Sequence, residues 1–169
     1  MEIQVLKVCN EDLEQYKKDM QEAFQKGVED VYGKIEETIL PERDIDISLH
    51  GQNAAAYKAV FNGEMVGGAV VSINEETGHN YLELLYVKYG TQAKGIGYEL
   101  WNRIEKLYPD TKVWETCTPY FEKRNIHFYV NKCGFHIVEF QNEKNLPTDE
   151  VEEFIGDGGE GMFIFKKQM

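Results

Sequence analysis

Two glycines stand where an apolar segment of the sequence gives way to a predicted helix. Gly95 and Gly97 belong to the segment Gln92–Gly97, which follows the apolar run Tyr81–Lys88. The first turn of a helix presents backbone N–H groups without intrahelical partners and the positive end of the helix dipole. Glycines there let an anion approach the backbone, so the segment could bind a phosphate or a pyrophosphate. An ordinary strand-to-helix turn that needs small residues would also explain them.

Two common phosphate-binding motifs do not match this segment. A Walker A loop requires a lysine directly after its second glycine, and Ile96 stands there. A dinucleotide-binding fingerprint requires a third glycine, where the sequence has Leu100, and the strands before it read as a hairpin rather than a βαβ unit. The pattern that matches is Gln/Arg-x-x-Gly-x-Gly/Ala, which Gln92, Gly95 and Gly97 fill.

Two carboxylates stand within apolar strand segments and could act as bases. Glu83 lies in the run 81–88, and Glu115 lies in a second predicted strand, 112–117. A carboxylate in an apolar strand is costly unless it is used or paired. Strand alternation predicts that Glu83 shares a face with Leu85. Either glutamate could take a proton directly or through water, and either could instead be a structural hydrogen-bond acceptor.

The hydrophobic pattern predicts the elements that position these residues. Asn62-Gly63 between two apolar runs predicts a hairpin, because both residues of the tight turn must accept a positive φ. Pro41 is expected to end a helix, and the polar segment 41–53 to form a loop or a short, poorly formed element. We expect strands at 2–8, 55–61, 64–73, 81–88, 112–117, 135–140 and 161–165, and helices at 11–26, 28–39, 95–107 and 120–132.

Length and composition predict one globular domain over residues 1–169, with 42% hydrophobic and 28% charged residues. The sequence has no run of about 18 apolar residues and no signal-like N-terminus, so we expect neither a membrane span nor secretion. Cys9, Cys117 and Cys133 lack Cys-x-x-Cys spacing, which favours a reducing cytoplasm and no metal site.

The net charge of −12 disfavours nucleic acid and anionic membranes as partners and favours a cationic substrate such as an amine. Acids in two segments could concentrate such a substrate if they flank the site. These acids are Glu42, Asp44 and Asp46, and then Asp149, Glu150, Glu152, Glu153, Asp157 and Glu160. The sequence leaves open whether the chain forms a homodimer.

Two signatures, in order along the chain, resemble the GNAT superfamily of N-acetyltransferases. The segment Gln92–Gly97 resembles its acetyl-CoA pyrophosphate loop, and Tyr129-x4-Gly134-Phe135 resembles its second signature. The resemblance covers about residues 54–141. It implies an α+β fold in three layers (α/β/α), with a mixed, mostly antiparallel sheet of the acyl-CoA N-acyltransferase type and helices on both faces. The strand that ends at Val87 and the strand 112–117 would be parallel neighbours that splay apart.

The same resemblance implies an N-acetyltransferase that uses acetyl-CoA and transfers the acetyl group to a primary amine of a small molecule or a peptide. Tyr129 would protonate the departing thiolate, and Glu83 or Glu115 would act as the base. A backbone N–H of the strand that ends at Val87 would stabilise the oxyanion. The cofactor would bind along Leu85, Tyr86, Val87, Gln92, Ala93, Lys94, Gly95, Ile96, Gly97 and Tyr98.

The sequence departs from the family pattern at one position. Seven residues before the tyrosine the family often has an asparagine, whereas this chain has Glu122 there and Asn125 one helical turn later. Asn125 is a predicted cofactor contact, but which of the two touches pantetheine stays open. Two other functions also stay open: a CoA-binding sensor that has lost catalysis, and an acyltransferase that uses a longer acyl-CoA.

Overall fold

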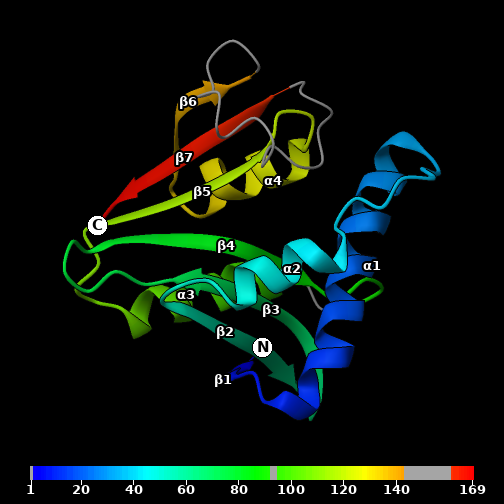
Figure 1. The fold of residues 1–169 in the computed structure, drawn as a ribbon, viewed down its shortest axis with the longest axis horizontal. Helices are drawn as coiled ribbons and strands as arrows, with labels where there is room; N and C mark the ends of the chain where they lie inside the picture. The colour runs from blue at the N-terminus through cyan, green and yellow to red at the C-terminus, as the bar shows by residue number, and fades with distance from the viewer. Residues whose placement is uncertain (1, 92–94, 143–160) are drawn as a thin grey trace.

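Seven strands form one sheet in the order β1-β2-β3-β4-β5-β7-β6, with helices on both faces (Figure 1). The structure is a computed structural model that describes residues 2–91, 95–142 and 161–169. The strands are β1 (Gln4–Lys7), β2 (Ala54–Phe61), β3 (Glu64–Ser72), β4 (His79–Val87), β5 (Val113–Pro119), β6 (His136–Gln141) and β7 (Met162–Gln168). Strands β4 and β5 are parallel and the other neighbours are antiparallel, which confirms the predicted mixed sheet.

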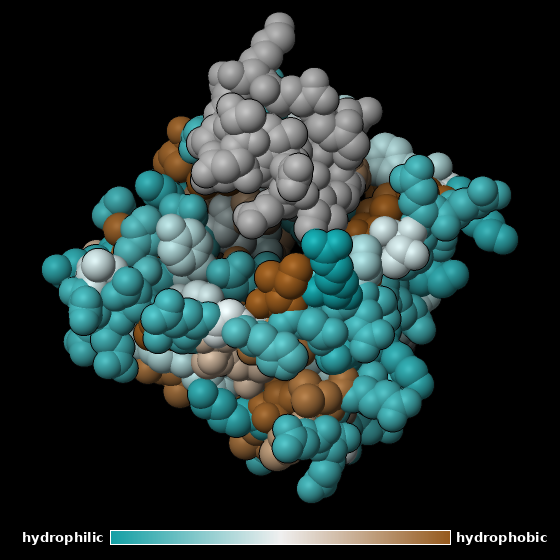
Figure 2. All heavy atoms as spheres, in the orientation of Figure 1, coloured by the Kyte–Doolittle hydropathy of each residue, from teal (hydrophilic) through white to brown (hydrophobic). Residues whose placement is uncertain are grey.

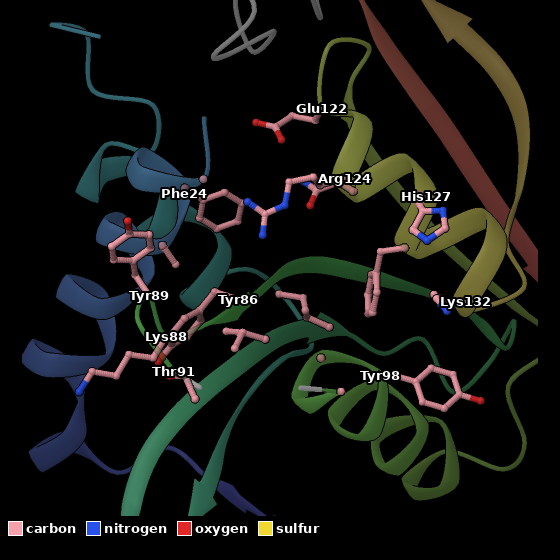
Figure 3. A pocket seen from close by; sticks show the side chains of 18 of the residues that line it. Phe24, Tyr86, Lys88, Tyr89, Thr91, Tyr98, Glu122, Arg124, His127 and Lys132 are labelled. Atoms are coloured by element: carbon pink, nitrogen blue, oxygen red, sulfur yellow. The ribbon is translucent and has the colours of Figure 1, made fainter. Parts of the chain in front are cut away.

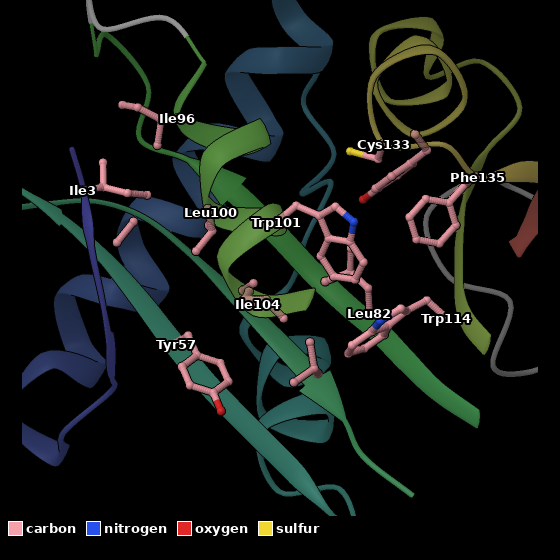
Figure 4. Packing of buried hydrophobic residues seen from close by; sticks show 14 of the residues in the cluster. Ile3, Tyr57, Leu82, Ile96, Leu100, Trp101, Ile104, Trp114, Cys133 and Phe135 are labelled. Carbon is pink, nitrogen blue, oxygen red and sulfur yellow. The ribbon is translucent and has the colours of Figure 1, made fainter. Parts of the chain in front are cut away.

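Each face of the sheet has its own hydrophobic core. The helical elements are η1 (Asn10–Asp12), α1 (Leu13–Tyr32), α2 (Glu42–Leu49), α3 (Ile96–Leu107), α4 (Lys123–His127) and the π-helical turn η2 (Phe128–Lys132). On one face, Trp101 of α3 packs edge-on against Trp114 of β5 with ring centroids 4.9 Å apart (Figure 4). On the other face, α1 and α2 bury Tyr16, Met20 and Ile45 against the sheet.

The surface agrees with the composition. On the face seen in Figure 2, hydrophilic side chains predominate, and hydrophobic ones are exposed as small separate groups. Within the described ranges, no helix is both long and apolar enough to cross a membrane.

The Asn62-Gly63 hairpin forms as predicted, and both residues have a positive φ, 52° and 79°. The predicted division of the N-terminal helices is wrong. Helix α1 continues to Tyr32 and ends at Gly33, whose positive φ of 85° is a backbone conformation that glycine accepts more easily than other residues. No helix covers 28–39 as a unit, and the segment 41–53, predicted as a loop or a short, poorly formed element, contains the regular eight-residue helix α2. Pro41 stands at the N-cap of α2 rather than at a helix end.

Side chains of α1 hold the connection between α1 and α2. Gln25 donates hydrogen bonds to the carbonyls of Ile35 and Glu37 and accepts one from the N–H of Ile39. Gln21 donates another to the Leu40 carbonyl. These bonds satisfy backbone groups that a helix over 28–39 would have paired internally.

The parallel pair β4–β5 is short and then opens. The strands pair at His79–Val113, Asn80–Trp114 and Tyr81–Glu115, and no further pairs follow. Beyond this point, the Thr116 hydroxyl donates to the Leu82 carbonyl at 2.9 Å, so a side chain takes the place of the next ladder bond. Figure 1 shows the two strands diverging toward their carboxyl ends. The predicted splay is therefore present.

A β-bulge in β4 changes where Glu83 points. Val71 pairs with Leu82 and Val70 pairs with Leu84, so Glu83 is the extra residue. Leu82 packs in the α3-side core, and Leu84 packs against the α1-side core. The alternation is thus reset at the bulge, and the prediction that Glu83 shares a face with Leu85 is wrong.

We predict that Gly68→Ala destabilises the fold by about 2 kcal/mol, because an added Cβ overpacks the core. It would lie 2.8 Å from the Tyr57 carbonyl oxygen and 2.9 Å from Cζ of Tyr16. The matched control is Gly27→Ala in α1, where no atom lies within 4 Å; it should raise stability by up to about 1 kcal/mol. Urea unfolding measures both. Equal free energies of unfolding for the two variants would contradict the packing described for Tyr16.

Candidate functional site

A cleft of about 1060 Å³ opens at the carboxyl end of β4, on the side where β4 has left β5 (Figure 3). Residues of α1 form one wall, residues of α4 and η2 form another, and β4 with the start of α3 forms the floor. Seven of the predicted cofactor residues line it, namely Leu85, Tyr86, Val87, Gly95, Gly97, Tyr98 and Asn125. The predicted contacts Gln92, Ala93 and Lys94 lie outside the described residues. The Ile96 side chain is buried in the core and does not line the cleft.

The edge of β4 that faces the cleft carries backbone donors. The N–H of Lys88 points the other way, toward β3, where it donates to the Val66 carbonyl at 2.8 Å. Because successive N–H groups of a strand point to opposite edges, those of Val87 and Leu85 point toward the cleft. In the described part of the chain, no strand pairs with this edge beyond Tyr81. An extended ligand could therefore add itself to the edge as a strand does.

The N-terminus of α3 lies at the same cleft. Gly95 is its N-cap residue, with a φ of 85°, and Gly97 follows in the first turn. A Cβ on Gly97 would lie 3.4 Å from both the Phe128 ring and the Val87 side chain, which themselves line the cleft. The glycine thus leaves room between the N-terminus of α3, the end of β4 and η2. This arrangement suits a phosphate group.

The cleft is less acidic than the chain. Its described lining includes three basic side chains, Lys88, Arg124 and Lys132, and two acidic ones, Asp30 and Glu122. Desolvation raises the pKa of Glu122, and the nearby Arg124 charge partly opposes this shift. Apart from Glu122, these residues were not predicted from the sequence. The motifs specify other positions of the chain, and only the fold shows which of many surface charges meet here.

Tyr129 lies at the inner end of the opening, behind the lining. It is 7% exposed, and its hydroxyl lies near the Thr116 side chain, whose own proton goes to Leu82 where the two strands part. Burial raises the pKa of the phenol, so the hydroxyl keeps its proton through the neutral range. The residue belongs to the π-helical turn η2, not to the continuous α-helix 120–132 that was predicted. Such turns are frequent at functional sites.

The two candidate bases lie on the sheet face opposite Leu85, and neither is among the described lining residues. Glu115 accepts from His79 at 3.1 Å and lies 3.8 Å from the ammonium of Lys166. It therefore has structural partners. Glu83 is exposed and has no ion pair in the part of the chain that the structure describes.

Cys117 is an exposed residue of β5 on which the charges of both carboxylates act, and its thiol is protonated at neutral pH. Desolvation, together with the charges of Glu83 and Glu115, raises the pKa of its thiol to about 11. Since the thiolate is the nucleophilic form, Cys117 is poorly suited to accept an acetyl group.

The acids expected to attract a cation do not surround the cleft in the described residues. Lys17 pairs with Glu42 and Asp46 on the surface of α2, and neither of these acids nor Asp44 lines the cleft. The acidic segment 149–160 lies outside the described residues.

The sequence profile described as "Acetyltransferase (GNAT) family" matches residues 13–135. The chain belongs to the GNAT acetyltransferase family. The fold described above agrees with this assignment. Membership of the family also accounts for both sequence signatures. Acetyl transfer is the chemistry that this family supports.

Individual proteins similar to this GNAT chain agree with the assignment. The uncharacterized protein YrkN of Bacillus subtilis (strain 168) is 50% identical over 141 residues, which are 82% of this chain and 76% of YrkN. The ribosomal-protein-S18-alanine N-acetyltransferase of Escherichia coli has a TM-score of 0.71 at 15% identity, over 99% of this chain and 94% of that one. The PaiA N-acetyltransferase of Thermoplasma acidophilum, in complex with coenzyme A, has 0.69 at 18% identity, over 100% of both chains. At these identities the two structures show the shared fold.

Gly97→Leu is expected to weaken acetyl-CoA binding at least tenfold, or roughly 1.4 kcal/mol, because the side chain would fill the space beside Phe128 and Val87. Calorimetry with acetyl-CoA measures the affinity. Lys106→Leu, at an exposed position in the last turn of α3, is the matched control and should bind as the wild type does. Unchanged affinity in a folded Gly97→Leu variant would show that the cofactor lies elsewhere.

Proposed function

We propose that this GNAT protein transfers the acetyl group of acetyl-CoA to a primary amine of a small molecule or a peptide, by direct attack of the amine. The observation that carries the proposal is the opening between β4 and β5. It presents backbone donors along one edge, a glycine-lined helix N-terminus at one end and a buried tyrosine hydroxyl at its inner end. Acetyl transfer requires a site that binds the extended pantetheine arm of the cofactor and also provides a proton donor for the departing thiolate.

The chain's own groups suit each part of acetyl-CoA. The pyrophosphate would accept hydrogen bonds from the first turn of α3. The pantetheine arm would pair with the β4 edge at Leu85 and Val87, and Asn125 lines the cleft beside that route. Lys88 and Lys132 offer positive charge to the phosphates at the cleft surface.

The acceptor must lose a proton before it attacks, since an ordinary ammonium has a pKa near 10 and only the free amine is nucleophilic. We assign this role to Glu83, directly or through water. The bulge turns Glu83 toward the α1 side of the sheet, and no ion pair occupies it in the described residues. Glu115 is the weaker candidate, because His79 and Lys166 already bind its carboxylate.

The attack forms the C–N bond while the carbonyl becomes an oxyanion, which a cleft-facing N–H of β4 would stabilise. The C–S bond then breaks, and the departing thiolate takes the proton of Tyr129, while the proton that the attacking nitrogen loses on becoming an amide returns to the phenolate directly or through water. Thr116, fixed by its hydrogen bond to the Leu82 carbonyl, lies near the phenol and would help to position it for that step.

The direct test is a panel of amines, polyamines, aminoglycosides and N-terminal peptides, each incubated with acetyl-CoA and assayed for released CoA and for the acetylated product. Amine-dependent release supports the proposal. Tight binding of acetyl-CoA without any amine-dependent release would favour a CoA-binding sensor instead.

Glu83→Gln is expected to lower kcat/KM at pH 7 by roughly 10²-fold, the usual size of a general-base contribution. Without the base, the variant can use only amine that is already deprotonated in solution. Its kcat/KM should therefore rise about tenfold per pH unit toward the amine pKa near 10. Glu115→Gln, the matched control on β5, should lose far less activity. A larger loss in Glu115→Gln than in Glu83→Gln would move the base to β5.

Tyr129→Phe keeps the ring that packs against Phe135 and Phe165 but removes the proton donor. Its kcat should fall by roughly 10²-fold with little change in acetyl-CoA affinity, because the hydroxyl acts on the leaving group. Steady-state kinetics and calorimetry separate the two effects. Wild-type kcat with a good amine would leave Tyr129 a purely structural residue.

A further inference from the structure

The part of the cleft next to α1 carries charges of both signs. Phe24 and Asp30 of α1 form one side, and Glu122 and Arg124 at the start of α4 form the other. The hydroxyl of Tyr89 donates to Asp30 at 3.4 Å across the outer end. These residues line the same cleft as Leu85 and Val87 of β4, the strand that carries Glu83. A ligand that bears only positive charge would pair with the acidic groups but would leave Arg124 without a counter-charge.

Arg124 is the basic group of this part. Figure 3 shows its side chain extending from α4 across the cleft toward Phe24 on α1. Arg124 is exposed and has no ion pair among the residues that the structure describes. A guanidinium presents a planar fork of donors that fits a carboxylate through two parallel hydrogen bonds. The Phe24 ring opposite would give the ligand's carbon skeleton an apolar surface.

The position of Arg124 also separates it from the expected pyrophosphate site. Helices α1 and α3 pack on opposite faces of the sheet. The pyrophosphate is expected at the N-terminus of α3, whereas the Arg124 side chain points to α1. An anion bound here is therefore more readily supplied by the acceptor than by the cofactor.

We propose that Arg124 binds a carboxylate of the acceptor, so that the substrate is an amine which also carries a carboxylate, such as an amino acid or an acidic peptide. This inference rests on the proposed acetyl transfer and specifies its substrate class. The net charge of −12 alone favours a purely cationic substrate. The charges that line the cleft, rather than the average charge, would contact the substrate, and they include Arg124.

The experiment compares acceptors that differ only in this group. One set pairs 4-aminobutyrate with 4-aminobutanamide, and the other pairs short peptides that have Glu or Gln at one position and the same N-terminal residue. The wild type should show a kcat/KM at least about tenfold higher for the carboxylate member, the size expected for a charged hydrogen bond. Arg124→Gln should lower kcat/KM for the carboxylate member at least tenfold more than for its partner. Arg124→Glu should reverse the preference.

The matched control is Arg43→Gln, at an exposed arginine of α2 outside the cleft lining, which should keep the wild-type preference. Equal losses for both members of a pair, or a wild-type preference for the uncharged members, would overturn the inference and leave acetyl transfer standing. If Arg124→Gln lowers the affinity for CoA at least tenfold in calorimetry but leaves the affinity for dephospho-CoA unchanged, Arg124 binds the cofactor's phosphate and the inference is wrong. Binding of acetyl-CoA without turnover of any acceptor would overturn both proposals.

Discussion

Two parallel strands that pair for only three residues determine the geometry of the whole site. Where β4 leaves β5, Thr116 closes the ladder with its side chain, and the remaining edge of β4 keeps cleft-facing donors at Leu85 and Val87. The α3-side core spans both halves of the sheet, and Trp101 of α3 packs against Trp114 of β5, so the two strands stay joined at the end where they pair. The cleft, the position of Tyr129 and the exposure of Glu83 all follow from this separation.

Most of the fold could be predicted from the sequence because its signals are local. A tight turn with two positive φ values needs Asn62-Gly63, and alternation and helical spacing identify the segments around it. The prediction of the N-terminal helices failed because α1 ends at Gly33 through a single positive φ, which the sequence does not specify. The apolar spacing over 28–39 is typical of a helix. In the structure, however, hydrogen bonds from the Gln25 side chain satisfy backbone groups that such a helix would have paired.

The site could be predicted only where it has a motif. Gly95 and Gly97 lie at the cleft because the turn that they form needs small residues. The direction of Glu83 could not be predicted, because an extra residue in β4 reverses the alternation and depends on the register with β3. The place of Arg124 beside α1 depends on how distant elements pack, and no spacing in the sequence encodes it.

The most direct measurement is residue-resolved amide exchange of β4 with and without saturating acetyl-CoA. The account predicts that the amides of Leu85 and Val87, which point into the cleft, exchange about tenfold or more slowly when the cofactor pairs with them. The amide of Tyr86, which points toward β3, should change little. Unchanged exchange at Leu85 and Val87, with acetyl-CoA shown to be bound by calorimetry, would contradict the claim that the open edge of β4 holds the cofactor.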